Sequence, residues 1–281
     1  MQWFNEFVQY LRLPFVQYAF IVGVIIAFVS SLLGVILVLK RFSYIGDGLS
    51  HVAFVSMAVA GIVGLTNEMY LTLPVTVGCA IFLILRSNKS KINGDALVAM
   101  AAVGALAVGY LVMNLFPTSG NVAADVCTTL FGTVAILTLT LDKVILCIIL
   151  AVIVILFFIL FYNKIFSITF DENFAKATGV KVGFINILIA VLSAVVIVLA
   201  MNLVGSLLIS ALIIFPALAA MRVFRTFKSV IISAGIISVV GTFVGICISI
   251  LASTPVGCTI VVVDIFVFII FYAIGLILKR S

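Results

Sequence analysis

The sequence predicts an all-α protein, a polytopic bundle of transmembrane helices, and two observations lead to this fold class. Of the 281 residues, 66% are hydrophobic and only 9% are charged. A soluble domain could not bury so much apolar surface, because a large share of any globular chain faces water. The apolar residues also form continuous runs of about 20, the length that a helix needs to cross a bilayer. A transmembrane β-barrel would instead show alternating segments of about ten residues.

Nine apolar runs follow one another, so we expect about nine spans, with eight or ten as the alternatives. The alternatives arise because almost no loop separates two runs near Val204, so that Gly183–Met221 could be divided differently. The runs cover Phe15–Leu39, Tyr44–Leu65, Met69–Leu85, Asp95–Leu115, Asp142–Tyr162, Gly183–Leu203, Gly205–Met221, Val230–Leu251 and Cys258–Leu278. They leave little chain for anything other than a single transmembrane domain over residues 1–281.

The basic residues predict the orientation of these spans. With the N-terminus outside and the C-terminus inside, only Arg12 and Lys143 of the 15 basic residues fall in outside segments. Cytoplasmic loops carry the excess of lysine and arginine in membrane proteins. The sequence therefore favours nine spans, N-out and C-in. The inside residues are Lys40, Arg41, Arg86, Lys89, Lys91, Lys164, Lys176, Lys181, Arg222, Arg225, Lys228, Lys279 and Arg280.

Two of the segments that connect the predicted spans are long enough to have structure of their own. The outside stretch Phe116–Thr140 is too short and polar to cross alone, so we expect interfacial or re-entrant packing. The inside loop Asn163–Val182 contains a short helix, in which Thr169 or Asp171 can cap the start and Gly179 suits the stop. Acidic residues also suit its first turn. The alternative for this loop is a surface segment that merely connects two spans.

The seventh run, Gly205–Met221, is rich in small residues and contains Pro216. Small side chains let membrane helices approach closely, and a proline frees a backbone carbonyl and kinks the helix. This composition fits a tightly packed helix near a permeation path, and it fits ordinary helix packing equally well.

Asp47 and His51 are the first candidate site. Their i, i+4 spacing places both side chains on one face of a helix. An acidic group at the centre of a membrane helix costs about 2.5–3.5 kcal/mol. A carboxylate beside an imidazole is the start of a site for a borderline divalent cation. The alternatives are a helix-dipole role for Asp47 and a hydrogen-bonded packing role for His51, the single histidine of the chain.

Asp264 is the other intramembrane charge, within the run Cys258–Leu278. At 1.5 Å per residue, Asp264 and His51 each lie roughly 10 Å from opposite membrane surfaces, so both come near the midplane. Asp264 could add a metal ligand, hold a proton, pair with His51 or pair with another polar group of the bundle.

Several functions are excluded by what the sequence lacks. It has no G-x-x-x-x-G-K-[ST] nucleotide loop and no H-E-x-x-H pair, so we expect a transport subunit and no enzyme. The net charge of +6 indicates cytoplasmic anchors in a membrane protein rather than a nucleic-acid partner. One aspartate and one histidine are also too few for a structural zinc site, and weak binding suits a transporter.

Four motifs resemble those of one family, the manganese/zinc/iron permeases of ATP-binding-cassette (ABC) importers. Arg41–His51 resembles R-x-S-x-x-G-D-x-L-S-H, and Val204–Ala217 resembles V-G-x-L-L-x-S-A-L-L-I-x-P-A. Phe170–Gly179 resembles the cytoplasmic loop F-D-x-x-F-A-x-x-x-G, and Pro255–Val262 resembles P-x-G-x-x-I-V. The resemblance covers nearly the whole chain, with the motifs in the right order.

The resemblance implies a homodimeric, multi-pass permease in a bacterial cytoplasmic membrane, surrounded by the lipid bilayer. It also implies two cytoplasmic ATPase subunits that bind ATP, and an extracellular metal-binding lipoprotein that delivers the ion. We expect no permanently bound cofactor, and Zn²⁺ or Mn²⁺ as the transported ion. Asp47 and His51 are then pathway ligands, to which Asp264 could add another. The coupling loop is about residues 164–182, and its ATPase contacts are Asp171, Glu172, Phe174, Ala175 and Gly179.

Three positions depart from the family pattern. Phe54–Ser56 replace the usual L-P-G after the histidine, Asn202 stands where lysine is frequent, and Asp264 stands where an uncharged residue is expected. These departures concern the choice of metal and the gate rather than the family.

The sequence therefore predicts the permease subunit of an ATP-driven importer for a transition-metal dication, with zinc or manganese before iron. The main alternative is a gradient-driven metal/proton carrier that uses Asp264 as its proton site. A heme or siderophore permease of the same superfamily would not need the Asp47–His51 pair, and a purely structural membrane subunit would need none of these charges.

Overall fold

The computed structural model describes residues 13–87, 94–116 and 139–278. These residues form helices and no strand, which confirms the predicted all-α class. The helices in chain order are α2 (Pro14–Leu39), α3 (Ile45–Val63), α4 (Met69–Ser87), α5 (Gly94–Leu115), α7 (Leu141–Phe170), α8 (Glu172–Ala177), α9 (Val182–Val204), α10 (Ser206–Val223), α11 (Phe227–Ala252) and α12 (Val256–Ile277).

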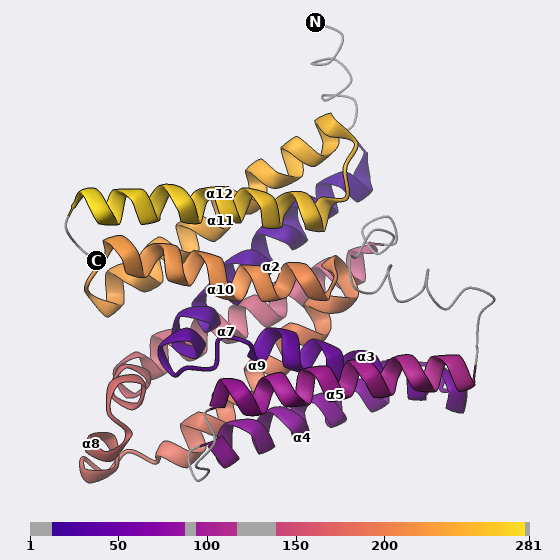
Figure 1. Cartoon of the computed structure of the whole chain (residues 1–281), viewed down its shortest axis with the longest axis horizontal. Helices are drawn as coiled ribbons and strands as arrows, with labels where there is room; N and C mark the ends of the chain where they lie inside the picture. The colour runs from indigo at the N-terminus through magenta and orange to yellow at the C-terminus, as the bar shows by residue number, and fades with distance from the viewer. Residues whose placement is uncertain (1–12, 88–93, 117–138, 279–281) are drawn as a thin grey trace, which may run out of the picture.

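Helix α10 packs against five other helices, namely α2, α3, α9, α11 and α12. In Figure 1, α11 and α12 lie on one flank of the bundle, and α3, α4 and α5 lie on the opposite flank. The short helix α8 projects from the end of the bundle where α7 stops. The central position of α10 brings it against α3, which carries Asp47 and His51.

Each of the nine predicted runs is a helix, and eight of the described helices are long and apolar enough to cross a membrane. The exception is α4, whose apolar part, Met69–Leu85, is shorter than these eight. The count of about nine spans and the N-out orientation stay predictions. The interfacial or re-entrant packing predicted for Phe116–Thr140 falls on residues 117–138, which lie outside the described ranges.

The helix that contains the apolar run Asp142–Tyr162 continues beyond it, because α7 is one helix of 30 residues that ends at Phe170. Ile165 and Ile168 are each only 1% exposed, so packing holds the added turns. At 1.5 Å per residue α7 is about 45 Å long, more than the hydrocarbon core of about 30 Å. The helix therefore extends beyond a bilayer and carries α8 at its end.

The division between α9 and α10 falls at Gly205, which confirms the predicted break next to Val204. Gly205 has a φ of 91°, a value that L side chains rarely adopt. Pro216 is buried inside α10. The helix also packs closely on α3, since a Cβ on Gly46 would lie 3.4 Å from Ser210 Cα.

Gly34 marks a close approach of α2 to α10. A Cβ at this position would collide with the carbonyl oxygen of Ile213 and lie 2.9 Å from its carbonyl carbon. Overfilling a packed site costs about 1–3 kcal/mol. We expect Gly34→Ala to lower the thermal unfolding midpoint of the purified protein in detergent. Gly104→Ala is the matched control, because nothing lies within 4 Å of its Cβ, and an unchanged midpoint for Gly34→Ala would contradict the expectation.

Candidate metal site and coupling helix

A short, well-ordered corner leads from α2 into α3. Lys40 caps α2, and Arg41 takes a left-handed φ of 63°. The amide of Phe42 then donates to the Leu37 carbonyl at 2.8 Å. Phe42 is 5% exposed and Ile45, the first residue of α3, is fully buried. The corner is therefore packed into the core and sets the direction of α3.

Asp47 and His51 lie in the first two turns of α3. Asp47 Oδ1 and His51 Nε2 are 3.4 Å apart, as their i, i+4 spacing predicted. The Asp47 side chain is 45% exposed and that of His51 is 12% exposed. The other ring nitrogen of His51, Nδ1, is buried and has no hydrogen-bond partner in the described part of the chain. The pair thus presents one carboxylate and one imidazole nitrogen together at the subunit surface.

Asp264 lies elsewhere, on α12, and is 2% exposed. A Cβ on Gly241 of α11 would be 2.6 Å from Asp264 Oδ1, so the carboxylate faces that helix. Neither carboxylate oxygen has a hydrogen-bond partner among residues 13–87, 94–116 and 139–278. No group of three or more His, Cys, Asp and Glu side chains in these ranges could hold a metal ion. The structure brings Asp47 and His51 together without Asp264, and a metal-binding role for Asp264 stays a prediction.

The predicted short helix is present as α8, and Asp171 is its cap. The Asp171 carboxylate accepts the backbone amides of Asn173 and Phe174, both at 2.9 Å. Thr169, the other candidate cap, instead donates its hydroxyl to the Ile165 carbonyl at 2.7 Å within α7. Gly179 follows the helix with a φ of 83°, as a stop position requires.

The predicted coupling residues have different positions in α8. Ala175 is fully buried, so it anchors the helix to the rest of the subunit. Phe174 is 61% exposed, and Phe170, just before the helix, is 60% exposed. The ring of Phe170 contacts that of Phe166 at a centroid distance of 4.9 Å. Phe174 is therefore the large apolar side chain that α8 itself presents outward.

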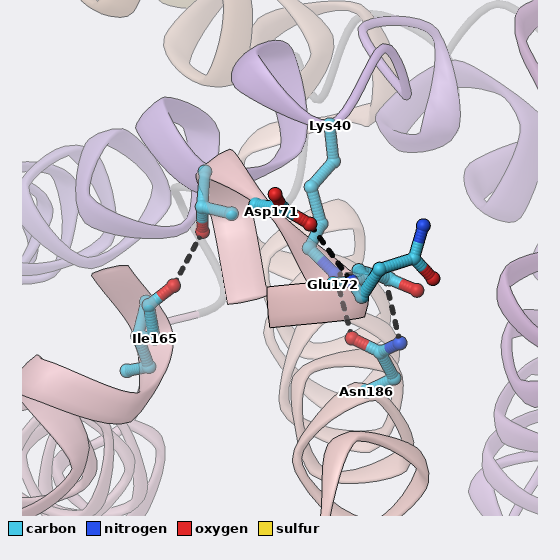
Figure 2. Close-up of polar contacts among 7 residues, drawn as sticks. Lys40, Ile165, Asp171, Glu172 and Asn186 are labelled. Atoms are coloured by element: carbon cyan, nitrogen blue, oxygen red, sulfur yellow. Dashed lines mark hydrogen bonds and ion pairs between the residues drawn. The ribbon is translucent and has the colours of Figure 1, made fainter. Parts of the chain in front are cut away.

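Glu172 points into the subunit, where it meets two residues that sequence reasoning missed. Lys40 Nζ lies 3.0 Å from Glu172 Oε1 and 2.6 Å from Asn186 Oδ1 (Figure 2). Burial lowers the pKa of Lys40, and the Glu172 carboxylate opposes that effect. The sequence carried one signal for this contact, an asparagine within the apolar run Gly183–Leu203. It indicated no partner for that asparagine, because Lys40 and Asn186 are far apart in the chain.

The comparison with known families identifies the chain. The profile of the ABC 3 transport family matches residues 12–275. The chain belongs to this family. It is accordingly a multi-pass membrane permease of a bacterial plasma membrane, and the resemblance seen in its motifs is confirmed.

The names of similar proteins refer to different metals. The chain is 28% identical to the high-affinity zinc uptake system membrane protein ZnuB of Haemophilus influenzae, covering 90% of this chain and 94% of that protein. It is 28% identical to the manganese import system permease protein ScaB of Streptococcus gordonii, over 96% and 95%. It is 26% identical to the chelated iron transport system membrane protein YfeD of Yersinia pestis, over 92% and 84%.

The fold also agrees with a solved structure. The chain superposes on one in the structure of PsaBC from Streptococcus pneumoniae in complex with Fab, with a TM-score of 0.81 and 26% identity. The match covers 96% of this chain and 95% of that one. A second structure, an inward-facing putative metal-chelate type ABC transporter, shares the fold at a TM-score of 0.69 and 18% identity.

Proposed function

We propose that this chain is the permease subunit of an ATP-driven importer for a transition-metal dication, with zinc or manganese favoured over iron. The observation that carries the proposal is the Asp47–His51 pair, a carboxylate and an imidazole 3.4 Å apart on a transmembrane helix. Relatives named for zinc, manganese and iron transport support the same class of ion. The carboxylate and imidazole are ligands that such ions accept.

The spacing of the pair suits one shared ion. Ligand atoms about 2.0–2.2 Å from a tetrahedral zinc ion are about 3.3–3.6 Å apart. Asp47 Oδ1 and His51 Nε2, at 3.4 Å, could bind such an ion with little movement. Two protein ligands are fewer than the three or four of a tight zinc site, which suits an ion that must be released again.

We infer that a second copy of the chain covers the pair. A half-exposed carboxylate such as that of Asp47 would be costly against lipid. A homodimer would instead line a shared aqueous path with this surface, and the second copy would contribute the same two types of ligand.

The exposed end of α8 is the proposed contact with a cytoplasmic ATPase subunit, with Phe174 as its apolar anchor. ATP would be bound and hydrolysed by that partner chain, and an extracellular metal-binding lipoprotein would deliver the ion. Membership of an ABC transport family supports this arrangement. No observation favours the gradient-driven carrier.

Metal analysis of cells that lack the protein tests the proposal. These cells are grown under limitation of zinc, manganese or iron in turn. We expect their cellular content of one of these metals to fall, and we expect that metal to be zinc or manganese before iron. The same cells supplied with the wild-type gene are the control. Unchanged contents of all three metals, measured by elemental analysis, would remove the import function.

A further inference from the structure

Three buried or partly buried polar side chains form a closed set of contacts that joins the end of α2 to α8 and α9. Lys40 contacts both Glu172 and Asn186, and the Asn186 amide donates to the same Glu172 oxygen at 3.1 Å. Figure 2 shows Lys40 extending from the end of α2 toward the start of α8 and the first turns of α9. These residues are called the polar triad below.

The polar triad is protected from solvent. The Lys40 side chain is 9% exposed, that of Glu172 is 25% exposed, and Asn186 is 2% exposed. A buried charge is tolerated only when it is paired and hydrogen-bonded, and Glu172 and Asn186 together provide this for Lys40. The Glu172 carboxylate is therefore occupied by contacts within the subunit.

The polar triad spans the gap between the α2–α3 corner and the start of α8. A cavity of about 200 Å³ separates them, lined by the corner and by the end of α7. Close packing across this gap is incomplete, and the polar triad bridges it with an ion pair and two hydrogen bonds. Its lining residues are Leu39, Lys40, Arg41, Phe42, Ile168, Thr169, Phe170 and Glu172.

The corner in turn leads directly to the candidate metal ligands. Phe42 and Ile45 are buried in the core, and the Ile45 amide donates to the Phe42 carbonyl at 3.1 Å. Asp47 follows Ile45 by two residues, in the first turn of α3. A displacement of Lys40 would thus be passed to Asp47 through a short, hydrogen-bonded segment.

We propose that the polar triad transmits movement of α8 to the end of α3 that carries Asp47 and His51. In this role Glu172 is a positioning residue that acts through Lys40, and it is not a docking contact for the ATPase. The proposal rests on the proposed function, since it explains how ATP hydrolysis at α8 reaches the ion. It adds Lys40 and Asn186 to the coupling machinery.

The test uses the complete transporter, with its ATPase subunits and binding protein, in lipid vesicles. Uptake of Zn²⁺ and of Mn²⁺, each supplied alone, is measured together with ATP hydrolysis. Mutations along a coupling route change coupling by about 2- to 30-fold. We expect Lys40→Met and Glu172→Gln each to lower the ratio of ions moved to ATP molecules hydrolysed by a factor of about 2 to 30, while hydrolysis continues. A merely structural role would lower both rates together.

Two further variants sharpen the test. The double variant Lys40→Glu with Glu172→Lys restores an ion pair with the charges exchanged, and the Asn186 amide can rotate to hydrogen-bond with it. We therefore expect the ratio of ions moved to ATP hydrolysed to return toward the wild-type value. Lys228→Met is the matched control, because Lys228 is an exposed lysine at the start of α11 that forms no ion pair with the described residues. We expect it to leave the ratio unchanged.

Different failures give different results. Wild-type ratios in assembled Lys40→Met and Glu172→Gln complexes would overturn the role of the polar triad. If these variants do not assemble, Glu172→Asp decides, since it keeps the charge but shortens the reach to Lys40, and a wild-type ratio would again overturn the role. A wild-type complex that moves neither metal at the expense of ATP would instead overturn the proposed function.

Discussion

Replacing Asp47 or His51 with alanine is expected to reduce metal uptake by at least about 10-fold, and up to about 100-fold, while the complex assembles normally. Losing even a residue that supports a metal ligand costs 10- to 100-fold in affinity or activity, and a ligand should cost no less. The side chains lie 3.4 Å apart and Asp47 is half-exposed, so its removal leaves the packing of α3 intact. Uptake by vesicles that contain equal amounts of complex measures the effect.

Two comparisons separate a ligand role from a structural one. Asp47→Asn keeps the size of the side chain and removes its charge, so it should fail as Asp47→Ala does. Glu68→Ala removes an exposed acidic side chain outside the helices and should transport as wild type does. Wild-type uptake by both Asp47→Ala and His51→Ala, at normal levels of complex, would remove these residues from the ion path.

Phe174→Asp is expected to separate the permease from its ATPase partner. Burying a phenylalanine side chain stabilises a contact by about 1.5–3 kcal/mol, and a loss of about 2 kcal/mol weakens association about 30-fold. Phe174 is 61% exposed, so its ring is available to a partner and its loss should not unfold the subunit. Association of purified permease with ATPase subunits, together with uptake per ATP, measures the effect.

Asn173→Asp is the matched control for Phe174→Asp. It adds the same negative charge one residue earlier, at the start of α8, where the helix dipole favours an anion. The ring of Phe174 stays in place, so association should be retained. If both variants bind the ATPase as wild type does, Phe174 is not the anchor. Ala175 cannot serve the same test, because it is fully buried and a charged substitution there would disturb the fold.

The fold class and the main candidate site could be predicted from local pattern. Runs of apolar residues are sufficient to predict membrane helices, because only helices and closed barrels satisfy their backbone groups in lipid. The pairing of Asp47 with His51 follows from the pitch of one helix. The N-terminal cap of α8 also depends on neighbouring residues, although only the structure shows that the capping residue is Asp171 rather than Thr169.

Contacts between distant segments could not be predicted in this way. Lys40 could be interpreted only as an orientation signal, and Glu172 only as a first-turn acid facing a partner. Their pairing with each other and with Asn186 depends on how α2, α8 and α9 converge. The length of α7 likewise depends on the burial of Ile165, which sequence hydropathy does not report.

By itself the sequence determined that this chain is a helical membrane protein with one carboxylate–imidazole pair, because helix periodicity and hydropathy act over neighbouring residues. The resemblance of its motifs to a known family indicated a permease. The tertiary structure alone decided which polar groups face one another. It left Asp264 apart from the pair, turned Glu172 inward and left Phe174 exposed. The physical reason is that burial and partner choice are set by helices brought together from distant parts of the chain.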